Sequence, residues 1–430
     1  MTRHRVIVVG VILSAVLAPR AASAQRPLSL VNAQAEARVH APDTAELQAR
    51  IAAAEAVAAQ AARRFRDDPT ITGGFSQGRL VGRSDESSWT LGIQQPFDWS
   101  GSWKPRAASA AADVERARHE REDGLRALDE QVAIAFADSA LAQRQRARGE
   151  RLADLYRLTS DAVRQQFQAG AAPEIDADSA DLDLVGALAL VDLAQGDLNR
   201  SRARLARLLG RESGGDLVVD DGSENPDVAV SAPEFLTLVN QDPRVRAALA
   251  EVDAATFQGQ IFERLTRPPI TVGVEYGRQT RDIPVGAFVG TPFAGSLAAN
   301  WTDAEMVFNV GVALPFVNRQ REPRAQAMGR VLTADAKLRT ARADVRAELE
   351  SSWAALQAAA SALQRVAPTG TIIDRDVTFV EQAVGAGAFD TLTRTLELRR
   401  LQEAGRRVDT AVRDFRAARA AWLRRISVSP

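Results

Sequence analysis

The sequence predicts a mainly helical protein with some β structure, made of two copies of one design: a β-hairpin followed by a long antiparallel coiled-coil hairpin. A Gly-rich turn occurs twice, around Gly170 and around Gly387, 217 positions apart. Each turn is followed by apolar residues at every seventh position, which is the period of coiled coils. Each copy also has two runs of alternating apolar and polar residues, a pattern typical of strands. This self-similarity at a fixed spacing indicates an internal repeat.

Three further landmarks agree with the repeat. Residues 71–79 resemble residues 270–278, which lie 199 positions later in the chain. Pro96-Phe97 recurs as Pro315-Phe316 after 219 positions, and Pro105-Arg106 recurs as Pro323-Arg324 after 218 positions. The change in offset predicts a longer loop inside the second copy. We therefore expect a first repeat over 25–211, a linker rich in Gly, Asp and Pro over 212–232, and a second repeat over 233–430.

The N-terminus has the three parts of a secretory signal peptide. Two arginines precede an apolar run over 6–17, and Ala22-Ser23-Ala24 follows it. We expect cleavage after Ala24, which makes 1–24 the signal peptide. A membrane anchor would need about 20 apolar residues, and Pro19 ends the run well before that length. The mature protein is therefore expected to be exported.

Composition argues against several classes of function. The 54 basic and 55 acidic residues nearly balance, so the chain lacks the basic footprint of a nucleic-acid binder. Three His and no Cys leave little for a metal or thiol site. No arrangement of nucleophile, base and orienting group is discernible, and there is no phosphate-binding loop. We expect a protein without a cofactor that is not an enzyme.

The helices of the two copies are predicted from propensity and breakers. Good helix formers dominate 44–65, and Pro69 ends this helix. After Pro105 the pattern predicts one helix up to Phe167, with weak points at Gly124 and Gly149. The second copy is expected to open with a single helix over 233–265. Its long helix should break at Pro368, because proline removes a backbone donor and clashes with the preceding turn.

Sevenfold apolar spacing marks the faces that pack in the coiled coils. It is seen in Leu184, Val191, Leu198 and Leu205, in Leu349, Leu356 and Leu363, and in Leu401, Val408, Phe415 and Trp422. We interpret these residues as core and assign them no further role.

Strands are predicted over 71–76, 89–94, 270–277 and 306–314. The two runs of the second copy are the clearer ones, each about ten residues long, which is the length of a strand that crosses a membrane in a barrel. The residues expected to face lipid are Val272, Val274, Phe308, Val310 and Val312. The alternative is a half-buried hairpin of a soluble protein. We favour membrane strands because the chain is predicted to be exported, and because neither hairpin has further strands nearby with which to form a core.

The order of helix, β-hairpin and long helical hairpin, repeated twice after a signal peptide, resembles the TolC family of outer-membrane efflux proteins from about Pro42 to Ile426. The most specific marks are the turn Phe167-x-x-Gly170 with Asp176, and the stretch Gln95-Pro96-Phe97-Asp98-Trp99-Ser100-Gly101 between strand and helix. The second-copy equivalent is Leu314-Pro315-Phe316-Val317-Asn318-Arg319-Gln320. It is similar to the heavy-metal efflux branch of the family.

The resemblance implies a homotrimer in which each chain gives four strands to a twelve-stranded barrel in the outer-membrane lipid, while the helices form a tunnel across the periplasm. It implies a passive exit duct for small molecules or metal ions in a tripartite efflux or type I secretion system. The partners would be an inner-membrane pump and a periplasmic adaptor, which contacts the tip turns at Phe167, Gly170 and Gly387. Partner chains are also expected on physical grounds, because four tilted strands cannot close around a lumen and lipid does not tolerate an open sheet edge.

The resemblance also places an acidic gate at the second tip, at the sixth and ninth positions after its glycine. Here Thr393 and Leu396 occupy those positions, and only Asp176, six residues after Gly170, is retained. The candidate residues of the periplasmic entrance are Asp176, Asp178, Asp390 and Arg394. The alternative is that they are solvated charges at helix starts, where an Asp suits an N-cap.

A second class of function stays open at this point. Periplasmic adaptors and scaffolds of efflux complexes also contain long helical hairpins. The two amphipathic β-hairpins distinguish the classes, because an adaptor has no use for a strand face that is apolar toward lipid. The sequence carries no motif for the exported substrate.

Overall fold

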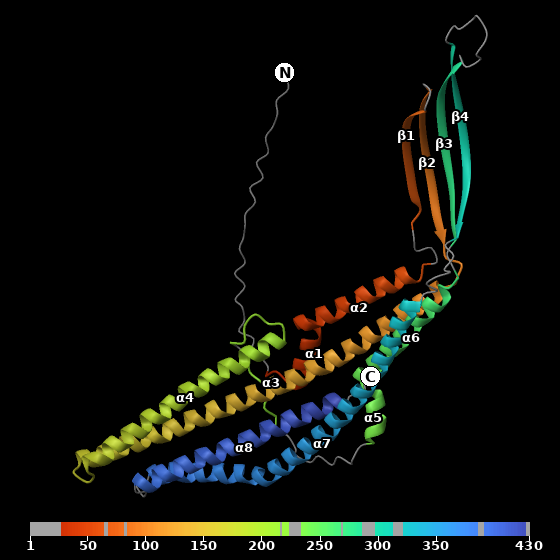
Figure 1. Cartoon of the computed structure of the whole chain (residues 1–430). Helices are drawn as coiled ribbons and strands as arrows, with labels where there is room; N and C mark the ends of the chain where they lie inside the picture. Colours follow the sequence, from red (N-terminus) through yellow and green to blue (C-terminus); the bar gives the residue numbers. More distant parts are fainter. Residues whose placement is uncertain are drawn as a thin grey trace, which may run out of the picture.

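The computed structural model describes residues 27–63, 68–80, 84–215, 217–222, 234–267, 270–285, 297–312, 321–385 and 391–426. They form an elongated molecule in which a four-stranded sheet stands at one end of a bundle of long helices (Figure 1). In these ranges no helix combines the length and the apolar character needed to cross a membrane. The predicted signal peptide and the segment 314–320 lie outside the described residues.

One antiparallel sheet contains all the described strands, in the order β1 (Thr70–Leu80), β2 (Ser84–Phe97), β3 (Ile270–Val285) and β4 (Leu297–Val312). The two hairpins are joined through β2 and β3, so the sheet combines both repeats. All four predicted strands are confirmed, but each is longer than its alternating run. β4 begins nine residues before the predicted start at Met306. Its first half lacks the alternation and forms a strand because it pairs with β3, for example Ala299 with Ile283.

The first repeat contains α1 (Leu30–His40), α2 (Pro42–Ala61), α3 (Trp103–Gln168) and α4 (Glu174–Leu208). The prediction of weak points in α3 is wrong, because the helix runs unbroken through Gly124 and Gly149. Gly124 allows α2 to approach closely, because a Cβ there would lie 2.6 Å from Cδ1 of Leu47. A Cβ at Gly149 would make an ordinary contact with Val191 on α4 at 3.5 Å.

The second repeat contains α5 (Phe235–Gln241), α6 (Pro243–Arg264), α7 (Arg321–Gly385) and α8 (Thr391–Ile426). The prediction of one helix over 233–265 is wrong, because the chain breaks at Asp242. Pro243 cannot donate a backbone hydrogen bond to continue α5. The carboxylate of Asp242 instead caps α6 by accepting from the Arg244 N–H at 2.9 Å.

The predicted break at Pro368 is also wrong, since α7 is continuous through it. The carbonyl that loses its donor belongs to Gln364, and both Gln364 and Pro368 are exposed. Solvent can therefore bind this carbonyl. On the other side of the helix Leu363 and Ile373 remain buried, and their packing maintains the helix across the proline.

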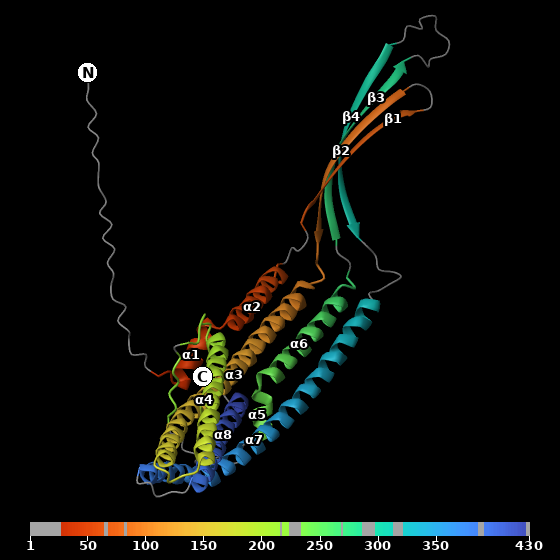
Figure 2. The same ribbon diagram turned by 90° about the vertical axis from the view of Figure 1, so that its left-hand side faces the viewer.

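The long helices continue the order of the strands. Figure 2 shows α2, α3, α6 and α7 side by side on the way to the sheet. Further from the sheet α4 packs along α3, and α8 packs between α3 and α7 (Figure 1). The heptad residues form these contacts, as predicted. Most of the heptad residues are buried, namely Leu198, Leu205, Leu349, Leu356, Leu363, Leu401, Phe415 and Trp422. The others are half-buried in the same helix contacts, namely Leu184, Val191 and Val408.

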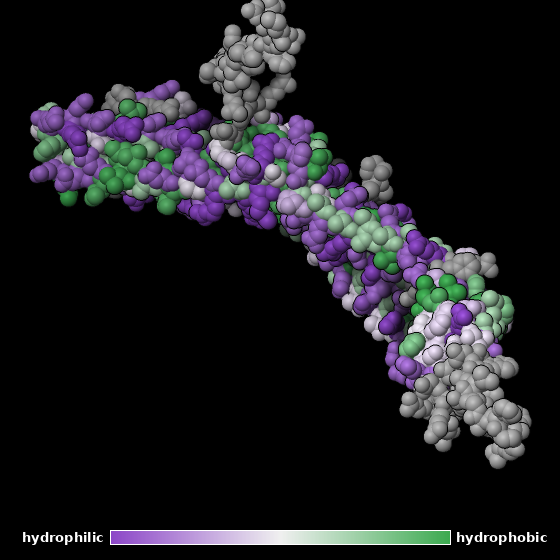
Figure 3. Space-filling view, turned by 90° about the horizontal axis from the view of Figure 1, so that it is seen from above, coloured by the Kyte–Doolittle hydropathy of each residue, from purple (hydrophilic) through white to green (hydrophobic). Residues whose placement is uncertain are grey.

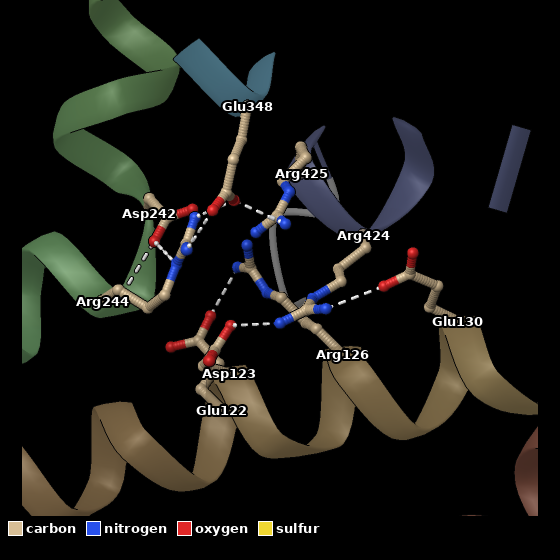
Figure 4. Close-up of polar contacts among 9 residues, drawn as sticks. All are labelled: Glu122, Asp123, Arg126, Glu130, Asp242, Arg244, Glu348, Arg424 and Arg425. Atoms are coloured by element: carbon tan, nitrogen blue, oxygen red, sulfur yellow. Dashed lines mark hydrogen bonds and ion pairs between the residues drawn. The ribbon is translucent and has the colours of Figure 1, made fainter. Parts of the chain in front are cut away.

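Ion pairs join the C-terminal end of α8 to the other helices (Figure 4). Arg424 donates to Glu130 of α3 at 2.8 Å and to Asp123 at 3.4 Å. Arg425 pairs with Glu348 of α7, which also accepts from Arg244 at 2.8 Å. One cluster of charges therefore connects α3, the start of α6, α7 and α8.

A buried ion pair joins the two repeats in the middle of the helical part. The Asp409 carboxylate on α8 is 2% exposed and accepts from both terminal nitrogens of Arg148 on α3. Gly405 makes room for this guanidinium, because a Cβ there would lie 2.5 Å from Nη1 of Arg148. Burial raises the pKa of Asp409 although Arg148 opposes the shift. The carboxylate therefore depends on its partner to stay charged.

We expect Arg148→Ala to lower the stability of the folded protein at neutral pH by about 3–5 kcal/mol, because it leaves a buried carboxylate unpaired. A raised folded-state pKa means that the stability from Asp409 is present below its unfolded-state value and is lost as pH rises through the folded-state pKa. The deficit of the variant should therefore shrink as pH falls. Apparent melting temperature, followed by circular dichroism against pH, measures this.

The matched control is Arg146→Ala, two residues before Arg148 on the same helix. It removes an exposed ion pair between Arg146 and Glu150. It should cost about 0.5 kcal/mol or less at any pH. Equal losses for the two variants, or a deficit of Arg148→Ala that does not change with pH, would contradict the role of the buried pair.

Candidate functional site

The sheet has one apolar face. Residues that pair directly across antiparallel strands point to the same side, so the register assigns every position to a face. The apolar face contains Ile71, Phe75, Trp89, Leu91, Ile93, Phe97, Ile270, Val272, Val274, Tyr276, Met306, Phe308, Val310 and Val312. Most of these are exposed, with Phe308 at 72% and Val310 at 69%. An apolar surface this large and uncovered is unusual for a soluble protein and marks an interaction with lipid or another protein.

The five residues predicted to face lipid all lie on this apolar face. Val272, Phe308, Val310 and Val312 are exposed and Val274 is half-buried. The soluble-hairpin alternative would require a covering layer, and no described helix packs on the sheet (Figure 1).

The opposite face of the sheet is small and polar. It contains Thr70, Thr72, Gly74, Ser76, Ser88, Thr90, Gly92, Gln94, Gly273, Glu275, Gly277, Gln279, Asp303, Glu305, Val307 and Asn309. Several glycines sit where a side chain would collide with a neighbour. A Cβ at Gly273, for example, would lie 2.8 Å from Cγ of Gln94. This face therefore suits a water-filled space, and its carboxylates include Glu275, Asp303 and Glu305.

The two edge strands leave backbone groups unpaired. Among the described residues β1 pairs only with β2, and β4 only with β3. Each edge thus presents a row of free N–H and C=O groups that a further strand could pair with.

The stretch from Gln95 to Gly101 forms the turn between β2 and α3. The Asp98 carboxylate accepts from the Ser100 N–H at 2.9 Å and from the hydroxyls of Ser100 and Ser102. Gly101 has a φ of 74°, which favours glycine. This motif directs the strand into the helix and is structural.

The first helical tip is built as the sequence predicts. α3 ends at Gln168, and Gly170 adopts a left-handed φ of 75° while its N–H donates to the Phe167 carbonyl at 2.9 Å. Phe167 is exposed at the end of the arm. Asp176 lies half-buried in the first turn of α4, where a negative charge favours the helix dipole. Asp178 is exposed two residues later.

Within the described part of the chain neither Asp176 nor Asp178 has an ion-pair partner. At the second tip Gly387 and Asp390 lie outside the described residues. Arg394 is placed only by its backbone, near the start of α8. The grouping of the four entrance residues therefore stays a prediction.

A contact between the two hairpins was missed by sequence reasoning. Arg399 of α8 donates to Asp183 of α4 at 2.9 Å. Tyr156 of α3 is buried beside this pair, and burial, followed by the charge of Asp183, raises the pKa of its phenol. The three residues border a groove of about 470 Å³ between α3, α4 and α8. The only sequence signal is that Asp183 precedes the heptad residue Leu184, a position where coiled coils often carry pairing charges.

Comparison with known proteins identifies the family. The family described as "Outer membrane efflux protein" matches residues 34–211. The match covers the first repeat and places it in this family of outer-membrane efflux proteins. It supports an efflux channel of the outer membrane with its helices on the periplasmic side. No curated protein sequence matches the chain.

Solved structures share the fold over nearly the whole chain. CusC, which forms a transmembrane channel, is 14% identical with a TM-score of 0.70, covering 92% of this chain and 91% of CusC. A membrane protein from Pseudomonas aeruginosa is 18% identical with a TM-score of 0.73, covering 93% of each. The open state of the MtrE outer membrane channel from Neisseria gonorrhoeae is 15% identical with a TM-score of 0.69, covering 92% and 88%. These likenesses are of similar size and do not single out the heavy-metal branch.

The face assignment of the efflux channel strands can be tested with one charge on each side. We expect Val310→Arg to reduce assembly in the outer membrane strongly, because arginine on the lipid side of a barrel costs about 2–4 kcal/mol at mid-depth. Asn309→Arg adds the same charge on the polar face, opposite Gly273, and should be tolerated. Yields of assembled protein in outer-membrane fractions measure the difference. Equal yields would reverse or abolish the face assignment.

Proposed function

We propose that the protein is the homotrimeric exit duct of a tripartite efflux system, joined to an inner-membrane pump by a periplasmic adaptor. The observation that carries the proposal is a sheet of four strands with a bare apolar face and two open edges. In lipid every backbone donor and acceptor must be paired within protein. Pairing β4 of one copy with β1 of the next satisfies both edges, and three copies give a closed barrel of twelve strands.

The helices of one chain also have two open flanks. Farther from the sheet the packing order of the described helices is α4, α3, α8 and α7, so α4 and α7 each have an open side there. Both flanks expose apolar residues, namely Val185 and Leu193 on α4 and Ile372 and Phe379 on α7. Apolar groups are visible along the otherwise hydrophilic arm in Figure 3. A copy placed by strand pairing would set α7 of one chain against α4 of the next.

The flank of α4 is shaped for close helix packing. At Gly186 and Gly196 an added Cβ would meet no atom within 4 Å, so these positions are open in the single chain. Gly196 lies on the exposed side of α4, away from the heptad residues that pack on α3, whereas Gly186 borders the groove between α3, α4 and α8. Small residues between exposed leucines form the holes that side chains of a second helix fill.

Transport through this duct would be passive. Within the described ranges there is no cluster of His, Asp and Glu that could hold a metal ion. The polar face contributes Glu275, Asp303 and Glu305 in every subunit, and their summed field would favour cations in the lumen. The adaptor or scaffold alternative does not account for the apolar face of the sheet.

We infer that the periplasmic entrance is held closed by contacts between the two hairpins as well as by the Asp176 tip. Arg399, Asp183 and Tyr156 connect α8, α4 and α3 within one chain. Separating the hairpins must break this pair, whereas Asp176 can act only across the threefold axis. Changes at Arg399 and changes at Asp176 should therefore affect the channel current differently.

The trimer can be tested by mass. Protein solubilised from the outer membrane should have three times the mass of the mature chain by light scattering with detergent correction. Val185→Glu adds a charge on the α4 flank and should lower the trimer yield, because burying an unpaired carboxylate is costly. Leu158→Glu is the control, since Leu158 is exposed on α3 and not on α4 or α7. A wild-type monomer would end the duct proposal.

The entrance can be tested by single-channel recording in planar bilayers. Arg399→Gln should raise the conductance several-fold by releasing α8 from α4. Arg400→Gln should leave it unchanged, because among the described residues Arg400 pairs with Glu397 on its own helix and is largely exposed. Asp176→Ala should weaken block by multivalent cations from the periplasmic side. If Asp176→Ala changes neither conductance nor block, Asp176 is a solvated residue of a helix start.

A further inference from the structure

One cation interrupts the apolar face of the sheet. In the register Arg278 of β3 lies between Trp89 of β2 and Ala304 of β4, so all three point to the apolar side. Phe75 of β1 pairs with Trp89 in the same row. Arg278 and its neighbours in this row are exposed. A guanidinium on a surface that faces lipid must find an anion or water.

Arg278 stands at the level where this face stops being apolar. The next row toward the helices contains Leu91, Tyr276 and Met306, and the Trp89 ring packs 5.5 Å from that of Tyr276. The next row away from the helices contains Gln77, Ser87, Thr280 and Thr302. The row of Arg278 therefore marks the upper border of the apolar band. Aromatic and basic residues at such a border suit the lipid headgroup region.

The width of the band fits a membrane. From Ile270 to Arg278 the strand advances eight residues (278 minus 270), about 27 Å at roughly 3.4 Å per residue. A strand tilt of about 35–45° reduces this to about 20 Å along the membrane normal, near the band height of barrels. At the other border Trp99 is exposed, and Nζ of Lys104 lies 5.7 Å from the Trp103 ring. The Arg278 end is the end farther from the helices (Figure 1).

The sheet itself supplies no anion for Arg278. In the described part of the chain Arg278 has no ion-pair partner. Another copy could not provide one at close range, because β3 is flanked by β2 and β4 of its own chain. The side chains directly beside Arg278 are therefore the aromatic ring of Trp89 and the methyl group of Ala304. The small Ala304 leaves open space next to the guanidinium, while Trp89 forms a wall on the other side.

We propose that Arg278, Trp89 and Ala304 form a binding site for the phosphate group of a lipid in the outer leaflet. The guanidinium donates two parallel hydrogen bonds to phosphate oxygens, a geometry that lysine cannot reproduce. The Trp89 ring contacts the lipid just below the phosphate. The site rests on the proposed barrel, since only a sheet that spans the outer membrane presents this face to lipid.

The test uses purified protein reconstituted in phosphatidylcholine vesicles that contain a phosphorylated disaccharide glycolipid, or the same glycolipid after dephosphorylation. Lipid retained per trimer after mild detergent extraction is counted by native mass spectrometry. Wild type should retain the phosphorylated form, and Arg278→Gln should retain about tenfold less, the size expected for a charge-assisted hydrogen bond. Arg278→Lys should recover only part of the loss. Arg146→Gln removes an equal charge from the periplasmic helices and should change nothing.

Three results would overturn the site. These are equal retention of the two glycolipids, equal retention by wild type and Arg278→Gln, or displacement of the lipid by inorganic phosphate at similar concentration, which would indicate a site for the free ion. Trimer mass and channel current are recorded on the same samples. A trimer that conducts normally but shows no lipid preference disproves only the lipid site, whereas a monomer disproves the duct.

Discussion

The unpaired backbone at the two edges of the sheet is the constraint on which the rest of the structure depends. A strand edge in lipid leaves donors and acceptors without partners, so the chain cannot be stable in the membrane alone. The helices inherit the strand order because α2, α3, α6 and α7 each connect to one strand. The open edges of β1 and β4 therefore continue as open flanks on α2 and α7, and on α4 and α7 farther from the sheet, where a partner chain would contact side chains instead of backbone.

Within one chain the two repeats are held together by different interactions at different heights. At the sheet the contact is the β2 and β3 ladder. In the helices it is a heptad core of few large residues, supported by the Arg148–Asp409 pair and by the charges around Arg424. Glycines such as Gly405 allow the guanidinium groups to reach their partners between closely packed helices. Many of the contacts between the two repeats are therefore polar contacts between particular residues.

The sequence predicted those features that depend on local periodicity. The strand faces, the heptad cores and the turn at Gly170 follow from spacing alone, and the structure contains all of them. Features decided by tertiary contact were missed or mispredicted. Gly124 and Pro368 are helix breakers by propensity, yet packing against Leu47 and burial of Leu363 keep α3 and α7 continuous. The same limit applies to the site, because the partners Asp183 and Arg399 are 216 residues apart.

The continuity of α3 and α7 also affects how such an entrance can open. A helix that broke at Gly149 or Pro368 could bend its lower half away, but these helices extend unbroken to the ends of their hairpins. The hairpins must then move as stiff rods against one another. In the chain as described, the contacts that resist this movement near the tips are the exposed pair of Arg399 with Asp183 and an apolar core that includes Tyr156 of α3 and Leu398 of α8. Water can replace the partners of an exposed pair at little cost, so most of the cost of opening would come from exposing this apolar core.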